Sequence, residues 1–89
     1  MTVENLDLAA RALAIVLDLE AVDLRADSPL DDLGADPVAR VLWADVVEEL
    51  AASAGTLVTI DDAALSAAVR LGDLADQIVP AADGTGGGA

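Results

Sequence analysis

The chain has 89 residues, 17 acidic residues against four arginines, a net charge of −13, and neither cysteine nor histidine. These counts exclude disulfides, thiolate metal sites and histidine-based chemistry, and they disfavour nucleic acid or anionic membranes as partners. An apolar fraction of 55% with one aromatic residue favours a single small helical domain with an aliphatic core. Without a signal-like start or a membrane-length apolar run, we expect a cytoplasmic monomer.

The first predicted element is a helix from Val3 to Leu19. Apolar residues recur there at the steps of three and four that mark one helix face, namely Leu6, Ala10, Leu13 and Leu17. A long connection follows from Glu20 to Ala35, and four apolar side chains are expected to pin it to the helices: Val22, Leu24, Leu30 and Leu33. Ser28 precedes a proline in this connection and is predicted to form a turn.

The second predicted helix runs from Pro37 to about Ala52. Asp36 is a favourable N-cap, and Pro37 fits the first helical position, where its missing N–H costs nothing. A helical wheel assigns one side to the core: Ala39, Leu42, Trp43, Val46, Val47 and Leu50. The opposite side carries Val38, Val41, Asp45, Glu48 and Glu49. Two valines on an acidic outer face exceed what helix packing requires.

Two shorter helices are predicted to complete an all-α fold. Asp61 is the expected cap of a third helix, Ala63 to Ala68, with Leu65 inward. A last helix opens near Leu71 and turns four residues inward: Leu71, Leu74, Ala75 and Ile78. Residues 1–79 are therefore expected to form the domain, and the Gly-rich residues 80–89 a flexible tail.

The run Leu33-Gly34-Ala35-Asp36, followed by a helix that ends in Val47-Glu48-Glu49-Leu50, resembles acyl carrier proteins. The resemblance implies a four-helix bundle with a short third helix and a long first loop. In that family, a serine after the aspartate carries 4′-phosphopantetheine. Here Gly34, Asp36 and Val38 fit the motif, but Pro37 occupies the serine position. Since proline has no hydroxyl, the cofactor cannot be attached at this residue.

The resemblance and the missing serine together predict a non-carrying pseudo-carrier rather than an enzyme. Its partners would be proteins with basic patches, such as synthases, ligases or transferases of a fatty-acid, polyketide or related thioester pathway. The expected docking residues are Val38, Val41, Asp45 and Glu48. The spacing of Asp31, Asp32 and Asp36 does not match a calcium loop, so no metal site is predicted.

Two alternatives stay open at this stage. The chain could be a true carrier, either modified at Ser28 or blocked by a Ser-to-Pro change at Pro37. It could also be an acidic helical adaptor that has no connection with thioester metabolism. Enzymes encoded beside it would favour a carrier-related function over the unrelated adaptor.

Overall fold

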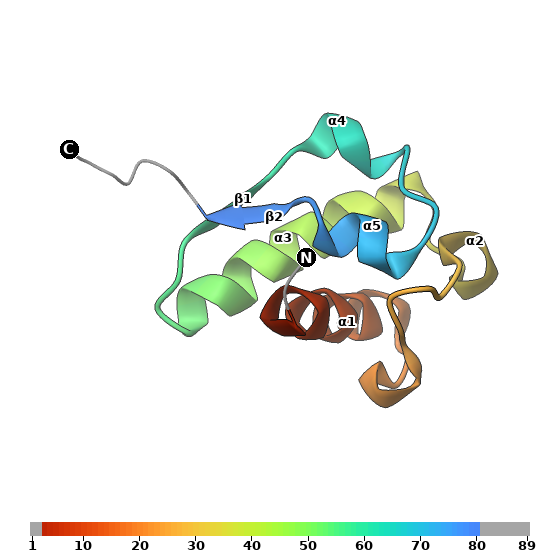
Figure 1. The fold of residues 1–89 in the computed structure, drawn as a ribbon, viewed down its shortest axis with the longest axis horizontal. Helices are drawn as coiled ribbons and strands as arrows, with labels where there is room; N and C mark the ends of the chain where they lie inside the picture. Colours follow the sequence, from red (N-terminus) through yellow and green to blue (C-terminus); the bar gives the residue numbers. More distant parts are fainter. Residues whose placement is uncertain (1–2, 81–89) are drawn as a thin grey trace.

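Two long helices form the base of the fold, which a computed structural model describes for residues 3–80. Helix α1 spans Val3–Leu17 and helix α3 spans Pro37–Ser53. They pack side by side and run in opposite directions (Figure 1). The remaining elements are short and lie across this pair. Among the described residues, no helix combines the length and the apolar character needed to cross a membrane.

Helix α1 ends two residues earlier than predicted. Asp18 adopts a left-handed conformation with φ of 57°, and the Leu19 N–H donates to the Ala14 carbonyl at 2.9 Å. A left-handed residue that directs the next N–H back into the last turn is a common helix stop. The predicted boundary at Leu19 is therefore wrong because a capping turn replaces the last helical residues.

The long connection contains a 3₁₀ turn, η1 (Ala21–Asp23), and one turn of α-helix, α2 (Leu30–Leu33). Leu30 is fully buried, and Leu24 and Leu33 pack partly buried against the core, as predicted. Val22, in contrast, is 84% exposed, so its predicted role as a pin is wrong. Val22 lies within η1, which buries none of its residues, whereas Leu24 follows η1 in an extended backbone conformation.

The chain after Ser53 forms α4 (Asp62–Leu65), α5 (Leu71–Ala75) and two strands, β1 (Val58–Ile60) and β2 (Ile78–Pro80). The strands pair antiparallel, with the buried Ile60 opposite the buried Ile78. The all-α prediction is therefore wrong in this part of a mostly helical fold. Ile78 faces inward as expected, but from a strand. Such short strands leave no clear alternating pattern in the sequence.

The short helices also differ in length from their predictions. Asp61 caps α4 by accepting the Ala63 N–H at 3.0 Å, as predicted, but α4 ends at Leu65 rather than Ala68. The N–H groups of Ala67 and Ala68 bond three residues back, as in 3₁₀ turns, at 3.2 Å. Beyond α5, β2 ends at Pro80, and the rest of the predicted tail lies outside the described residues.

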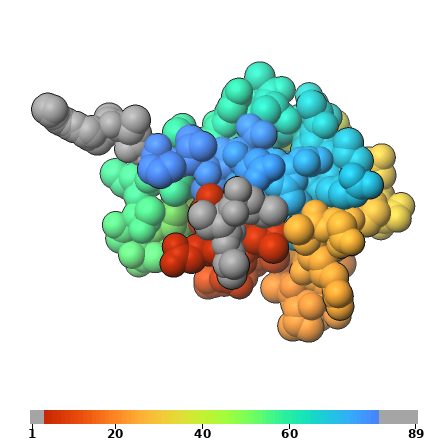
Figure 2. Space-filling view, viewed as in Figure 1, coloured from red at the N-terminus to blue at the C-terminus, as the bar shows by residue number. Residues whose placement is uncertain are grey.

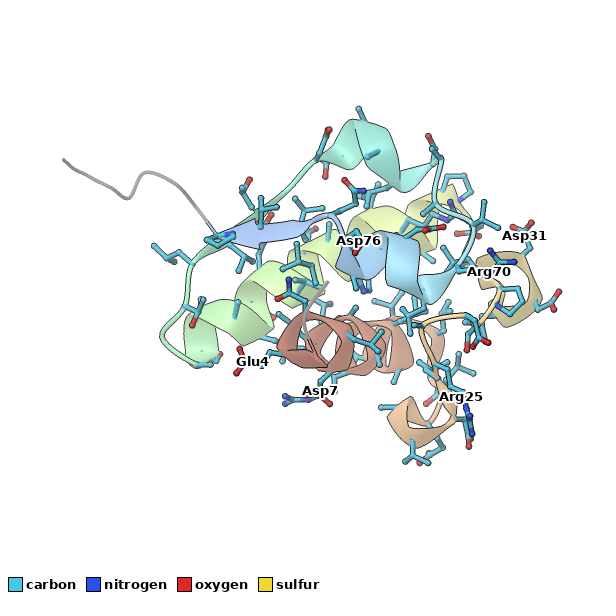
Figure 3. All side chains as sticks on the ribbon, in the orientation of Figure 1. Glu4, Asp7, Arg25, Asp31, Arg70 and Asp76 are labelled. Carbon is cyan, nitrogen blue, oxygen red and sulfur yellow. The ribbon has the colours of Figure 1, made fainter. Side chains whose placement is uncertain are left out.

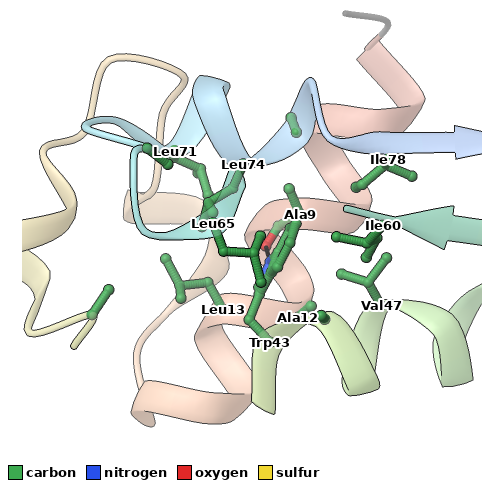
Figure 4. Packing of buried hydrophobic residues seen from close by; sticks show 14 of the residues in the cluster. Ala9, Ala12, Leu13, Trp43, Val47, Ile60, Leu65, Leu71, Leu74 and Ile78 are labelled. Atoms are coloured by element: carbon green, nitrogen blue, oxygen red, sulfur yellow. Dashed lines mark hydrogen bonds between the residues drawn. The ribbon is translucent and has the colours of Figure 1, made fainter. Parts of the chain in front are cut away.

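Trp43 of α3 lies at the centre of the core. Its side chain is fully buried, and the indole Nε1 donates to the Ala9 carbonyl of α1 at 3.0 Å. In Figure 4 the indole lies among side chains from α1, α4 and α5. Figure 2 shows α5 bordering α1 on this face of the molecule. The aliphatic core predicted from composition is thus built around the one aromatic residue.

Candidate interaction surface at the start of α3

The loop before α3 is fixed by local backbone geometry. Gly34 follows α2 with φ of 85°, a left-handed conformation that glycine adopts without strain. A Cβ there would meet no atom within 4 Å, so the conformation, and not crowding, favours glycine. Asp36 Oδ1 accepts the Ala39 N–H at 2.8 Å, which confirms the predicted N-cap. Pro37 is exposed at the first position of α3.

Ser28, the alternative attachment residue, takes part in a turn. Its Oγ accepts the Arg25 N–H at 2.9 Å, and its own N–H donates to the Arg25 carbonyl at 3.0 Å. The neighbouring Pro29 forms an antiparallel bridge with Arg70, so this segment lies against the start of α5. This geometry confirms the predicted turn.

The outward side of α3 carries apolar residues first and acids after them. Val38 is 69% exposed and Val41 52% exposed, as the wheel predicted, and Asp45 and Glu48 are exposed as well. With about 100° of rotation per residue, five of the exposed positions, from Val38 to Glu48, lie within an arc of roughly 120°. We call Val38, Val41, Leu42, Asp45 and Glu48 the α3 face.

Leu42 belongs to this face, contrary to its predicted place in the core. Its side chain is 50% exposed. The buried stripe of α3 is rotated away from Leu42 and runs through Arg40, Trp43, Ala44, Val47 and Ala51. The wheel centred the core side on the larger apolar residues, which included Leu42, and left out Arg40 and Ala44, which lie on the buried stripe.

Arg40 is the functional candidate that the sequence analysis missed. It is 7% exposed and is the one buried charged residue among those described. Its Nε donates to the Ala35 carbonyl at 2.9 Å. Its Nη1 donates to the carbonyls of Leu65 and Ala68, at 2.8 and 3.0 Å. The sequence did contain a sign that Arg40 is buried. Trp43 follows it after three residues, and Val47 and Ala51 follow at further steps of four, so all four residues share one helix face.

The same guanidinium also faces solvent at one edge. Its Nη2 lies 3.8 Å from Asp31 Oδ1, and the Asp31 side chain is 99% exposed. An exposed pair of this kind contributes little to stability. Figure 3 places Asp31 and Arg70 at the same end of the molecule. Within residues 3–80, no group of acidic side chains is arranged to hold a metal ion.

Comparison of the chain with protein-family models, with curated proteins and with solved structures finds no match. The likeness to acyl carrier proteins therefore rests on the residues quoted from this sequence. Leu33, Gly34, Asp36 and Val38 carry it, together with the Val-Glu-Glu-Leu run, residues 47–50, within α3.

Proposed function

We propose that the chain is a non-carrying relative of acyl carrier proteins that docks cationic partner proteins through the α3 face. In this proposal α1, α3, α4 and α5 correspond to the four helices of the carrier bundle. Two long helices, a long first connection and a short third helix follow in the order that the resemblance implies. The partners would be enzymes of a thioester pathway.

One observation carries the proposal, namely the exposure of Val38, Val41 and Leu42 beside acids on one helix. Burying such side chains would contribute affinity, whereas the acids would mainly accelerate encounter with a basic surface. The apolar residues occupy the first turns of α3, and Asp45 and Glu48 follow them. A complementary partner would therefore place an apolar contact near Pro37 and its basic residues farther along the helix.

The acidic residues also argue against self-association through this face. Two copies would bring Asp45 and Glu48 of each chain toward those of the other, and the whole chain carries a net charge of −13. Like charges that meet across an interface cost binding energy, whereas a basic partner relieves the repulsion. The charge of the α3 face thus favours a different, basic protein over a second copy.

The docking proposal is tested by capture of partners from the native lysate with wild type and Val41→Asp. We expect Val41→Asp to weaken binding by roughly 1–2 kcal/mol, the scale of a modest hot spot. Val22→Asp is the matched control, because it makes the same substitution at an 84% exposed valine of η1. Equal loss of capture in both variants would contradict a site on α3. Glu48→Arg is expected chiefly to slow association.

The non-carrying part is tested by intact mass after coexpression with a broad-specificity phosphopantetheinyl transferase. We expect the wild-type mass to stay unchanged, because Pro37 offers no hydroxyl to the phosphoryl transfer. An adduct on wild type, at Ser28 or elsewhere, would establish the carrier alternative instead. Gain of one adduct by Pro37→Ser would support the assignment of this position to the attachment site.

A further inference from the structure

The α4 segment, residues 61–69, has few contacts that hold it to the rest of the molecule. Helix α4 itself has four residues, far below the length at which a helix is stable alone. Within the segment only Leu65 and Ala68 are buried. On its α5 side an open cavity of ≈ 290 Å³ is lined by Ala64, Ala67, Ala68, Asp73, Asp76 and Gln77. The segment is therefore not tightly packed on that side.

Arg40 holds the middle of this segment by side-chain hydrogen bonds, whereas its end is held at Val69, whose carbonyl accepts the Leu30 N–H at 2.9 Å. One nitrogen, Nη1, binds the carbonyls at Leu65 and Ala68, while Nε binds the Ala35 carbonyl before α3. The guanidinium is planar, and its donors are fixed relative to one another. It therefore fixes the position of the α4 segment, through the carbonyls of Leu65 and Ala68, relative to the Ala35 carbonyl before α3.

We propose that Arg40 acts as a clamp that holds the α4 segment closed, and that this segment opens as a local unit while α1 and α3 stay packed. Without the guanidinium, the Ala68 carbonyl would lose the Arg40 donor and the Leu65 carbonyl would keep only the Ala68 N–H at 3.2 Å, and a buried acceptor that loses its donor is costly. Opening relieves that cost by exposing both carbonyls to water. The α1–α3 contact needs no such relief, since Trp43 and Ala9 join it independently.

Native-state amide hydrogen exchange followed by NMR tests the clamp. The reporters are the N–H groups of Ala64, Ala67 and Ala68 in the α4 segment and of Leu13 in α1. Arg40→Met keeps a long apolar stem and removes every donor. We expect it to accelerate exchange in the α4 segment at least about tenfold more than at Leu13. Arg40→Lys, which keeps the charge but not the planar fork, is expected to fall between wild type and Arg40→Met.

Two variants separate the clamp from general destabilisation. Val47→Ala weakens the same helix at a fully buried residue and leaves the Arg40 hydrogen bonds in place. It should therefore not reduce the protection of the α4 amides from exchange more than that of Leu13. Asp31→Asn removes only the exposed ion pair and is expected to leave exchange as in wild type. Equal acceleration at α4 and at Leu13 in Arg40→Met, or none at α4, would overturn the proposal.

Wild type alone provides a second test should Arg40→Met fail to fold. As denaturant rises within the native range, the α4 amides are expected to exchange through an opening with a shallower denaturant dependence than Leu13. If the exchange of the α4 amides and of Leu13 showed the same dependence on denaturant concentration, the clamp proposal would also be overturned. The measurement involves no partner, so its failure would leave the docking proposal untouched, and failed capture would leave the clamp untouched.

Discussion

The two halves of the molecule, before and after Ser53, reach their folded shape by different means. In the first half, α1 and α3 have 15 and 17 residues and bury continuous stripes against each other. In the second half each helix or strand has three to five residues. Such elements do not persist alone. Their positions depend on single buried side chains and on hydrogen bonds to remote segments.

Backbone hydrogen bonds show this dependence at the start of α5. The N–H of Leu71 donates to the Ser28 carbonyl at 3.0 Å, and that of Gly72 to the Ala26 carbonyl at 2.8 Å. The Leu30 N–H donates in return to the Val69 carbonyl at 2.9 Å. The long connection and the second half thus hold each other in place. Periodicity in a sequence reveals long helices with a continuous buried stripe. It gives no sign of short elements that are held by hydrogen bonds to remote segments.

Removing the contact between the long helices is expected to have the largest effect. Trp43→Ala deletes the central core side chain and the hydrogen bond from its Nε1 to the Ala9 carbonyl. We expect a loss of roughly 3–5 kcal/mol in unfolding free energy. Urea denaturation followed by far-UV circular dichroism measures it. Trp43→Phe, which keeps much of the volume, is the control, and a loss below about 1 kcal/mol in Trp43→Ala would contradict the central role of this residue.

A smaller effect, of opposite sign, is expected where α1 ends. Asp18 is a non-glycine residue at φ of 57°, and its carboxylate lies at the negative end of the helix dipole. Asp18→Gly is expected to stabilise the fold by about 0.5–1 kcal/mol, measured by thermal denaturation. Asp18→Asn removes the charge alone. If Asp18→Asn gave the whole gain, backbone strain would not be the cause.

The smallest expected effect lies in the second half and at acidic pH. Asp73 Oδ2 accepts the N–H groups of Val69 and Arg70, at 2.9 and 3.0 Å. These bonds, with a lesser contribution from the Arg70 charge, hold the pKa of Asp73 below 3.8. Because the pKa of Asp73 is lower in the folded state, this carboxylate stabilises the fold above pH 3.8. The contribution is lost as the pH falls through the folded-state pKa.

Asp73→Asn is therefore expected to flatten the loss of stability below pH 3.8. Urea midpoints collected across that range measure the effect. Asp45→Asn removes one exposed carboxylate from α3 and controls for the change in net charge. Identical pH profiles for wild type and Asp73→Asn would show that these backbone bonds do not couple protonation to folding.

The start of α3 could be predicted from the sequence because its determinants are neighbours in the chain. Asp36 and Pro37 define the N-cap and the first turn without help from any distant residue. The outward positions of Val38 and Val41 followed from the helical period. Leu42 and Arg40 could not be placed by hydrophobicity alone. The inward position of Arg40 depends on the carbonyl groups of Leu65 and Ala68, 25 and 28 residues farther along the chain.

The strands were missed for a related reason. Val58–Ile60 and Ile78–Pro80 pair across the whole second half, and neither segment is long enough to show alternation. Ile78 fitted equally well on the inward side of a longer helix. Its carbonyl instead accepts from Asn5 Nδ2 at 3.2 Å, a contact spanning 73 positions. Local patterns identified Ile78 as buried and could not identify the element that carries it.

The single indole has a consequence for spectroscopy. Because the chain contains no tyrosine or phenylalanine, all of its aromatic fluorescence comes from Trp43. That emission reports the junction of α1 and α3, where Nε1 is bonded to Ala9. Separation of the two helices would expose the indole to water and shift its emission to longer wavelength. Opening at α4 alone would uncover only the side of the indole that faces Leu65. It would therefore shift the emission less than separation of α1 and α3, so fluorescence and amide exchange together would distinguish the two kinds of opening without any added label.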